Sequence, residues 1–437
     1  MRALFVTLLT TGGAQIANLV SSVLAARLLL PEGRGEFQAA WLWPTTVAYL
    51  VLFGLNDSVL YFSASRSEKP RAIFASGLLI GTVLSLAAAG ITYFLVIPWA
   101  YQGYRPEVRD LAVLMMLLIP CHIITPVFLE LLRGQHRMVS WNLLRLSLGI
   151  AYLLFILLFF AAGRADIMSF GLAYLGAHAV PLVLALWLTL DAGWGSLAPS
   201  RRTLRRLLGF GAKVHSGAVV NQLNGRIDQM LVATVLDETA LGLYGSALAL
   251  SQATPTLANS IGLVAYPRAC AEPDHAGRAT IIGLYLRLTV LLMLSTTVVL
   301  YLLAPWIVGL LYGKSFMPAV PVLRVLLLGV TPLAIRELFN TAFKAFERPL
   351  SSTKGEVMAL IVNAGCLALL VPWFGLLGAA WAFVIVRWTS ILYLGWLVNR
   401  DLGLGLVDLF MPRHTDWIRA KSALRTLWQG IGAKPAQ

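Results

Sequence analysis

A short polar stretch interrupts one of the apolar segments of the chain. Residues 221–230 read NQLNGRIDQM and hold one arginine and one aspartate among four amides. The amide residues are Asn221, Gln222, Asn224 and Gln229. Amides hydrogen-bond hydroxyl groups, and the guanidinium of Arg226 matches the oxygens of a phosphate. Asp228 can balance an arginine or bind a coupling cation. These residue types predict a site for a polar, anionic molecule.

The segment around this stretch, residues 208–236, is otherwise apolar enough to cross a bilayer. On a helical projection with 100° per residue, Asp228 points in nearly the same direction as Asn221. The other polar residues fall on both sides of this direction, with Lys213 at one edge, and together form a wide polar arc. The opposite arc holds apolar side chains. Because a packed helix interface needs only one or two amides, the wide polar arc favours the wall of a water-filled cavity.

The composition predicts an all-α, polytopic membrane protein. The chain is 58% hydrophobic and 12% charged, with a net charge of +14 and a mean hydropathy of +0.77, whereas soluble domains carry about 25% charged residues. Basic loops on a cytoplasmic face explain the positive charge, and nucleic-acid binding is not expected. Three scattered cysteines and six histidines without ligand spacing predict no disulfide, metal site or cofactor.

Apolar runs long enough to cross a bilayer recur along the chain. We predict about twelve spans, at residues 3–29, 37–62, 72–97, 110–132, 139–162, 167–190, 208–236, 240–266, 279–311, 319–343, 355–372 and 376–399. The longest connection divides them into an N-terminal six-helix lobe (1–190), a cytoplasmic linker (191–207), a C-terminal six-helix lobe (208–399) and a basic cytoplasmic tail (400–437). The tail is expected to form an amphipathic helix on the inner leaflet, with a disordered basic end as the alternative.

The N-terminal segment is interpreted as the first span, with a cleaved signal peptide as the alternative. Its polar residues Thr11, Gln15, Asn18 and Ser22 fall at i, i+4, i+7 and i+11, which is one helix face. A removed segment would not need such a face. We therefore expect Gln15 and Asn18 to line a protein interior or a cavity.

Basic residues predict the orientation. With the N-terminus inside, 21 Lys and Arg fall on the inner side and 5 on the outer side. Both termini are therefore expected in the cytoplasm.

The two halves echo each other. GEFQAA at 35–40 matches GLYGSA at 242–247, and RGQHR at 133–137 matches KAFER at 344–348. Both pairs are separated by nearly the same offset, which predicts a parallel internal repeat with substrate between the halves.

Charged residues inside the spans must face protein or water, because a lone charge at mid-bilayer costs at least about 3 kcal/mol. Arg145 and Arg287 join Arg226 as candidate anion-binding residues, and Asp57 and Glu130 join Asp228 as candidate ion-coupling residues. Snorkelling and structural ion pairs are the alternative for each charge.

The chain resembles the polysaccharide-transport branch, the Wzx-type flippases, of the multidrug/oligosaccharidyl-lipid/polysaccharide exporter superfamily. The resembling stretches are LLLPEGRGEFQAA, RIDQMLVATVLDETALGLYGSALAL, LLYGKSFMPAVPVLRVLLLGV and VPWFGLLGAAWAF. The resemblance implies two lobes, a V-shaped cationic cavity and alternating access in the bacterial inner membrane. It also implies an undecaprenyl-pyrophosphate-linked oligosaccharide as the cargo, for O-antigen or exopolysaccharide assembly, with the polysaccharide polymerase and the chain-length machinery as candidate partners.

Two alternatives remain. A drug/cation antiporter of the same fold would favour acidic residues in the cavity, whereas basic residues dominate here. A membrane glycosyltransferase or ligase usually needs a sizeable extramembrane loop with catalytic groups, and the sequence has none. We therefore expect a transporter rather than an enzyme. Because no ATPase motif occurs, its energy should come from an ion gradient or from removal of the product.

Overall fold

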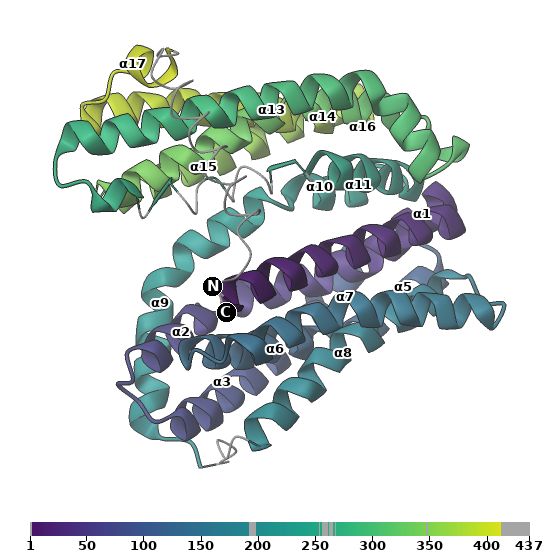
Figure 1. The fold of residues 1–437 in the computed structure, drawn as a ribbon. Helices are drawn as coiled ribbons and strands as arrows, with labels where there is room; N and C mark the ends of the chain where they lie inside the picture. The colour runs from purple at the N-terminus through teal and green to yellow at the C-terminus, as the bar shows by residue number, and fades with distance from the viewer. Residues whose placement is uncertain are drawn as a thin grey trace, which may run out of the picture. The chain divides into compact units, whose positions relative to one another are not determined.

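The computed structural model of the 437-residue chain describes residues 2–191, 198–252, 254–255, 261, 265–266, 268–346 and 348–411. Within these ranges the chain forms helices and no strands (Figure 1). The predicted all-α class is confirmed. The predicted amphipathic helix of the tail falls almost entirely on residues 412–437, outside the described ranges.

The helices follow one another along the whole described chain. The first part comprises α1 (Arg2–Val51), α2 (Leu55–Ala64), α3 (Pro70–Ile91), the π-helix η1 (Thr92–Val96), α4 (Ile97–Ala100), α5 (Pro106–Met115), α6 (Leu118–Gly134), α7 (Met138–Ala161) and α8 (Ile167–Asp191). The second part comprises α9 (Arg201–Asn224), α10 (Ile227–Val235), α11 (Glu238–Gln252), α13 (His275–Leu311), the 3₁₀-helix η2 (Lys314–Phe316), α14 (Ala319–Leu327), α15 (Val330–Ala345), α16 (Pro349–Leu402) and α17 (Leu406–Phe410).

Eight helical stretches of the described residues are long and apolar enough to cross a membrane. Two of them, in α1 and α16, each combine two predicted spans. Each of these helices continues across a bend at one residue with a non-helical backbone, Leu30 (φ 61°) in α1 and Gly375 (φ 54°) in α16. The predicted span 208–236 is not among the eight, and 240–266 lies partly outside the described residues. The chain is thus a multi-pass membrane protein.

The segment 208–236 is not the single continuous helix that we expected. Helix α9 already begins at Arg201, where the Ser200 hydroxyl accepts a hydrogen bond from the Thr203 amide at 3.4 Å. It ends at Asn224, and α10 begins at Ile227. Gly225, a poor helix former, and Arg226, whose φ is −135°, lie between the two helices. The projection of 100° per residue therefore does not hold across the polar stretch.

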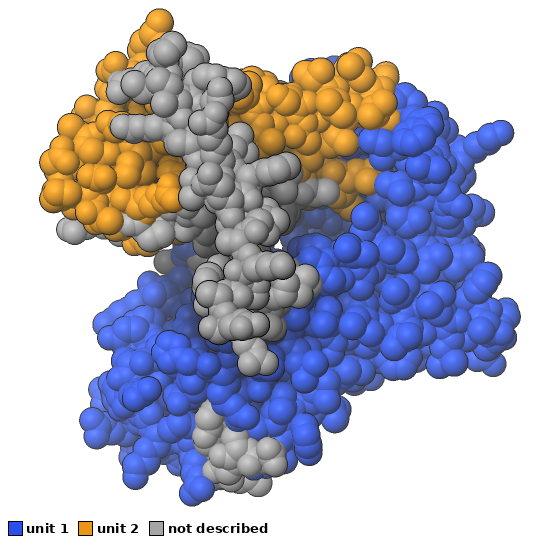
Figure 2. All heavy atoms as spheres, in the orientation of Figure 1, with its two compact units in different colours: residues 1–248, 304–323, 360–382 blue, residues 249–303, 324–359, 383–437 orange. Residues whose placement is uncertain are grey.

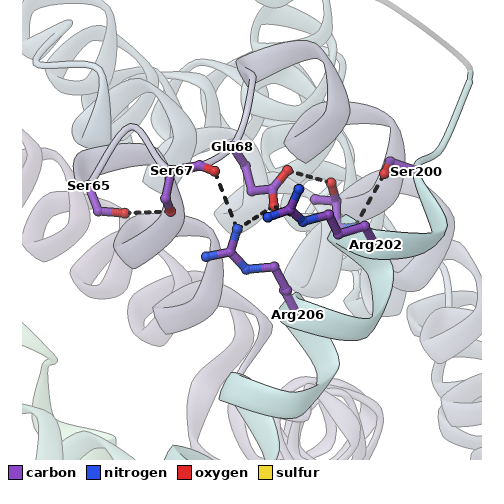
Figure 3. A network of polar contacts seen from close by, with 7 residues as sticks. Ser65, Ser67, Glu68, Ser200, Arg202 and Arg206 are labelled. Carbon is purple, nitrogen blue, oxygen red and sulfur yellow. Dashed lines mark hydrogen bonds and ion pairs between the residues drawn. The ribbon is translucent and has the colours of Figure 1, made fainter.

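The start of α9 is anchored on the connection between α2 and α3 (Figure 3). Glu68 accepts hydrogen bonds from Arg206 at 2.5 Å and from the Thr203 hydroxyl at 2.8 Å, and Arg202 lies 3.9 Å away. Burial alone would raise the pKa of Glu68, but these hydrogen bonds and the two positive charges outweigh it and lower the pKa. The carboxylate therefore stays charged at neutral pH and holds α9 in place.

The chain divides into two compact units, coloured in Figure 2. Unit 1 comprises Met1–Leu248, Ala304–Leu323 and Leu360–Ala382, and unit 2 comprises Ala249–Leu303, Arg324–Ala359 and Phe383–Gln437. In unit 1, α7 packs against both α1 and α8, and α6 packs against α2 and α3. The core of unit 2 is built from α13, α15 and α16. The boundaries of the two six-helix lobes stay a prediction.

Candidate binding cavities

A cavity of about 340 Å³ lies inside unit 1. It is called the larger cavity here, in comparison with a neighbouring cavity of about 300 Å³. Helices α1, α6, α7 and α8 form its wall. Its polar lining residues are Thr10, Thr11, Gln15, Asn18, Tyr49, His122, Thr125, Asn142, Arg145 and His178. Among the described lining residues there are hydroxyls, amides, imidazoles and one guanidinium, but no carboxylate. This wall suits a ligand that carries hydroxyl groups and negative charge.

The polar stripe of the first span lies on this wall. Thr11, Gln15 and Asn18 all line the larger cavity, as their helical spacing predicts. The hydroxyl of the neighbouring Thr10 donates to the side-chain oxygen of Asn142 at 3.1 Å and so ties α1 to α7. Local periodicity in α1 therefore places two of the predicted binding residues, Gln15 and Asn18, beside the same space.

Arg145 supplies the guanidinium of the larger cavity. It comes from α7, lines the cavity and is an exposed residue. The guanidinium carbon lies 4.5 Å from the ring centre of Trp141, one turn earlier on the same helix. A cation over an aromatic face is stabilised by the ring quadrupole, so Trp141 orients Arg145 without neutralising it.

Arg226 lies behind the aromatic wall rather than in the lining. Its guanidinium donates hydrogen bonds to the hydroxyls of Thr45 at 2.7 Å and Thr46 at 3.4 Å. Its guanidinium carbon is 5.6 Å from the ring centre of Trp41 and 5.4 Å from that of Tyr49. Tyr49 lines the larger cavity. The predicted phosphate ligand is thus placed next to the cavity, one aromatic layer away.

The rest of the polar stretch is divided between contacts inside unit 1. Buried Asp228 accepts a hydrogen bond from the Tyr244 hydroxyl at 2.6 Å. The Gln229 side-chain oxygen accepts one from Gln38 at 2.9 Å. The remaining predicted residues of this segment differ in exposure: Asn224 is buried, Gln222 is half-buried, and Asn221 and Lys213 are exposed. None of these residues is part of the described lining of the larger cavity.

Three further predicted residues lie elsewhere. Arg287 belongs to unit 2, where it donates to the backbone carbonyls of Asp408 at 3.2 Å and Leu409 at 3.0 Å. Glu130 forms an ion pair with Arg133 at 3.3 Å, one turn away on α6. Asp57 is exposed in the first turn of α2. Arg287 also lines a cavity of about 400 Å³ within unit 2, and the roles predicted for Arg287, Glu130 and Asp57 stay predictions.

A stacked pair of histidines was missed by the sequence reasoning. The rings of His122 on α6 and His178 on α8 lie 4.9 Å apart at 20°, and both line the larger cavity. Each Nδ1 lies 2.9 Å from the carbonyl oxygen of the residue four positions earlier, Leu118 or Tyr174. The pairing depends on how α6 packs against α8, so no spacing in the sequence could indicate it.

A second, smaller cavity of about 300 Å³ shares Asn18, Leu148 and His178 with the larger cavity. It contains Arg34, which lies between the predicted spans 3–29 and 37–62. Helix α1 continues through this connection, and only Leu30 leaves the helical conformation.

The fold is similar to solved membrane transporters. Lipid II flippase MurJ in an inward closed conformation is 14% identical, with a TM-score of 0.78, over 93% of this chain and 89% of that chain. An inward-facing multidrug resistance MATE family transporter of the MOP superfamily is 14% identical, with a TM-score of 0.75, over 89% of this chain and 95% of that chain. A MOP superfamily transporter from Pyrococcus furiosus is 16% identical, with a TM-score of 0.62, over 92% of this chain and 95% of that chain.

These likenesses confirm the two-lobed transporter fold that the resemblance implied. No curated protein matches the chain. Residues 1–270 match the model of a family described as polysaccharide biosynthesis protein. The chain therefore belongs to the polysaccharide biosynthesis protein family, on the fold of the MOP-superfamily transporters.

Proposed function

We propose that the protein is a flippase for lipid-linked oligosaccharides. It would move undecaprenyl-pyrophosphate-linked glycan units from the cytoplasmic to the periplasmic leaflet of the bacterial inner membrane by alternating access. The observation that carries the proposal is the larger cavity, whose described wall combines hydroxyls, amides and a guanidinium without a carboxylate. Membership of the polysaccharide biosynthesis family supports a glycan as the cargo.

The lining residues have complementary roles in this proposal. Sugar hydroxyls both donate and accept hydrogen bonds, and the amides of Gln15, Asn18 and Asn142 do the same. Arg145 would bind the pyrophosphate, because its guanidinium presents a fork of donors to phosphate oxygens. The lipid tail would remain in the bilayer. The protein would thus shield only the polar headgroup from the hydrocarbon of the bilayer.

The direction and the energy source of transport are part of the proposal. The basic residues of the predicted inner loops support a cytoplasmic location of both termini. Asp228, Asp57 and Glu130 are the proposed ion-coupling candidates. Asp228 is the strongest of them, because it is buried in unit 1, where its carboxylate accepts a hydrogen bond from the Tyr244 hydroxyl. The polysaccharide polymerase and the chain-length machinery are proposed partners.

The cation antiporter alternative receives less support. A cationic drug would need a carboxylate on the cavity wall to balance its charge, since burying an unpaired charge is costly. The described lining of the larger cavity provides the positive Arg145 instead. Its electrostatics therefore favour an anionic headgroup.

The proposal is tested with Arg145 in a strain that lacks the chromosomal gene. Arg145→Ala should cause undecaprenyl-linked oligosaccharide to accumulate on the cytoplasmic leaflet, with export reduced by at least about tenfold, because a charge-assisted contact to phosphate is lost. Arg145→Lys should restore part of the export, since the charge remains but the fork does not. Arg109→Ala, at an exposed position on α5 outside both cavities, is the matched control. Normal export by Arg145→Ala at normal protein level would overturn the proposed cavity.

A further inference from the structure

We infer that the smaller cavity is a subsite for an acidic sugar of the cargo, with Arg34 and Tyr152 binding the sugar carboxylate. The inference rests on the proposed function, because it assigns one part of the glycan that the flippase would carry. It concerns residues that the sequence reasoning did not select. Its ligand class is a pyranose ring that bears a carboxylate, such as a hexuronic acid.

Aromatic side chains form the walls of the smaller cavity. Tyr174 lies at their centre, with ring-centre distances of 5.6 Å to Phe37, 5.9 Å to Trp41 and 5.3 Å to Tyr152. The face of an aromatic ring carries partial negative charge, and the C–H groups on the face of a pyranose carry partial positive charge. A sugar ring can therefore pack against these faces while its hydroxyls point along the cavity.

Arg34 brings positive charge into this aromatic space. Its terminal nitrogen donates a long hydrogen bond of 3.4 Å to the Ser22 hydroxyl, and its guanidinium carbon lies 5.8 Å from the ring centre of Phe37. Within the described part of the chain Arg34 forms no ion pair, and its Nε atom is buried without a hydrogen-bond partner. A guanidinium in this state retains donors for an incoming oxyanion.

The Tyr152 hydroxyl is a second donor on the same wall. Tyr152 is only 9% exposed, and no acceptor among the described residues takes its O–H proton. The Arg34 guanidinium lies close enough to act on the phenol oxygen by its charge and as a hydrogen-bond donor, which leaves the O–H proton of Tyr152 for a ligand. Because a buried polar group without a partner costs free energy, a ligand that accepts from Tyr152 and Arg34 together would remove two penalties. A carboxylate, with two acceptor oxygens, fits this pair of donors.

The position of the cavity supports a sugar rather than an isolated ion. Asn18 and His178 line both cavities, so a single extended headgroup can occupy the two spaces at once. The larger cavity has its own guanidinium, Arg145, for the pyrophosphate. The oxyanion at Arg34 would then belong to the glycan. A phosphate shares the same anion chemistry, and the experiment below distinguishes the two sources.

The test measures binding of small probes to the full-length protein in phosphatidylcholine nanodiscs. The probes are methyl glucuronide, methyl glucoside and inorganic pyrophosphate, and equilibrium dialysis measures the binding of each. We expect methyl glucuronide to bind about tenfold more tightly than methyl glucoside, as a charge-assisted hydrogen bond implies. Arg34→Gln should abolish this preference, and Arg34→Lys should keep part of it. Arg109→Gln should bind all three probes like the wild type.

Tyr152→Phe removes only one hydroxyl and so provides a test that does not depend on replacing a charge. It should weaken methyl glucuronide several-fold and leave methyl glucoside unchanged. Equal binding of the two sugars by the wild type, or a preference that survives both Arg34→Gln and Tyr152→Phe, would overturn the subsite. Pyrophosphate binding by the wild type that is tighter than glucuronide binding and is lost in Arg34→Gln would overturn the acidic sugar and assign Arg34 to the lipid phosphate.

Failure of this inference is separable from failure of the proposed function. The binding assay requires no transport, whereas the export assay with Arg145→Ala requires no acidic sugar. If the wild type shows no preference for glucuronide but its export depends on Arg145, only the subsite is rejected. Normal export by Arg145→Ala would reject the flippase proposal, whatever the smaller cavity binds.

Discussion

Arg226 shows how one charged side chain is accommodated inside an apolar unit. It has hydroxyl acceptors on Thr45 and Thr46 and aromatic faces on two sides, but no ion pair among the described residues. Such contacts hold a guanidinium in place while its positive charge remains. Since Tyr49 separates it from the larger cavity, Arg226 would act on a phosphate through the position of this ring and through its long-range charge.

At the residue scale we predict that Arg226→Ala reduces flipping by at least about tenfold while the protein stays in the membrane. Arg226→Lys should recover part of the activity, because it keeps the charge and loses the fork. Thr45→Val removes the acceptor at 2.7 Å and should lower flipping as well, whereas Thr45→Ser should not. The measurement is undecaprenyl-linked oligosaccharide on the cytoplasmic leaflet, and normal export by Arg226→Ala at normal protein level would make the arginine purely structural.

Two helices of unit 1 meet at positions that the predicted repeat relates. Gly35 in α1 and Gly242 in α11 occupy the first position of the matching stretches GEFQAA and GLYGSA. A Cβ on Gly35 would overlap the carbonyl oxygen of Glu238, and a Cβ on Gly242 would overlap that of Pro31. The contact is thus reciprocal, with each glycine against the residue four positions before the other. Both helices can approach this closely only because neither position has a side chain.

At the element scale we predict that Gly35→Ala destabilises the protein by about 1–3 kcal/mol, because the added methyl group forces the two backbones apart. Gly242→Ala should act in the same direction. Gly90→Ala on α3 is the matched control, since a Cβ there meets nothing within 4 Å, and it should be neutral or stabilising by up to about 1 kcal/mol. Thermal unfolding of the purified variants measures the effect, and equal melting temperatures for Gly35→Ala and Gly90→Ala would contradict the close crossing.

The whole molecule is a multi-pass membrane protein, and its charge distribution predicts its orientation. The inner set of predicted loops holds most of the Lys and Arg, and positive charge is retained on the cytoplasmic side during insertion. The connection between α2 and α3, where Glu68 contacts its arginine partners (Figure 3), belongs to this predicted inner set. The same orientation sets the direction of the proposed transport.

At the molecular scale we predict the labelling of single cysteines by an impermeant thiol reagent in intact cells. The native cysteines Cys121, Cys270 and Cys366 are first replaced by alanine. Cysteines introduced at Ser67, Ser200 and Thr353 should be protected, because the predicted topology places them on the cytoplasmic side. Cysteines at Gly103 and Ser315 should react. Permeabilised cells, in which the exposed positions Ser67 and Thr353 become reactive, are the control, and the reverse pattern would invert both the topology and the direction of transport.

The sequence alone determined the class of the protein and part of its cavity. Apolar runs and charge distribution are properties of the chain itself, so they predicted the all-α, multi-pass fold, which the structure confirms. The i, i+4, i+7 stripe that includes Gln15 and Asn18 is equally local, because a single regular helix creates it, and both residues line the larger cavity. The prediction of one continuous helix over 208–236 failed at Gly225 and Arg226, where the helix breaks and regular periodicity no longer applies.

Only the tertiary structure decided which distant residues meet. His122 and His178 stack because α6 packs against α8, and Arg34 faces Tyr152 because α1 continues past its kink beside α7. Arg226 reaches Thr45 because α10 lies against the second half of α1. Each pair is far apart in the chain, so its contact depends on helix packing and burial rather than on spacing, and local patterns carry no information about it.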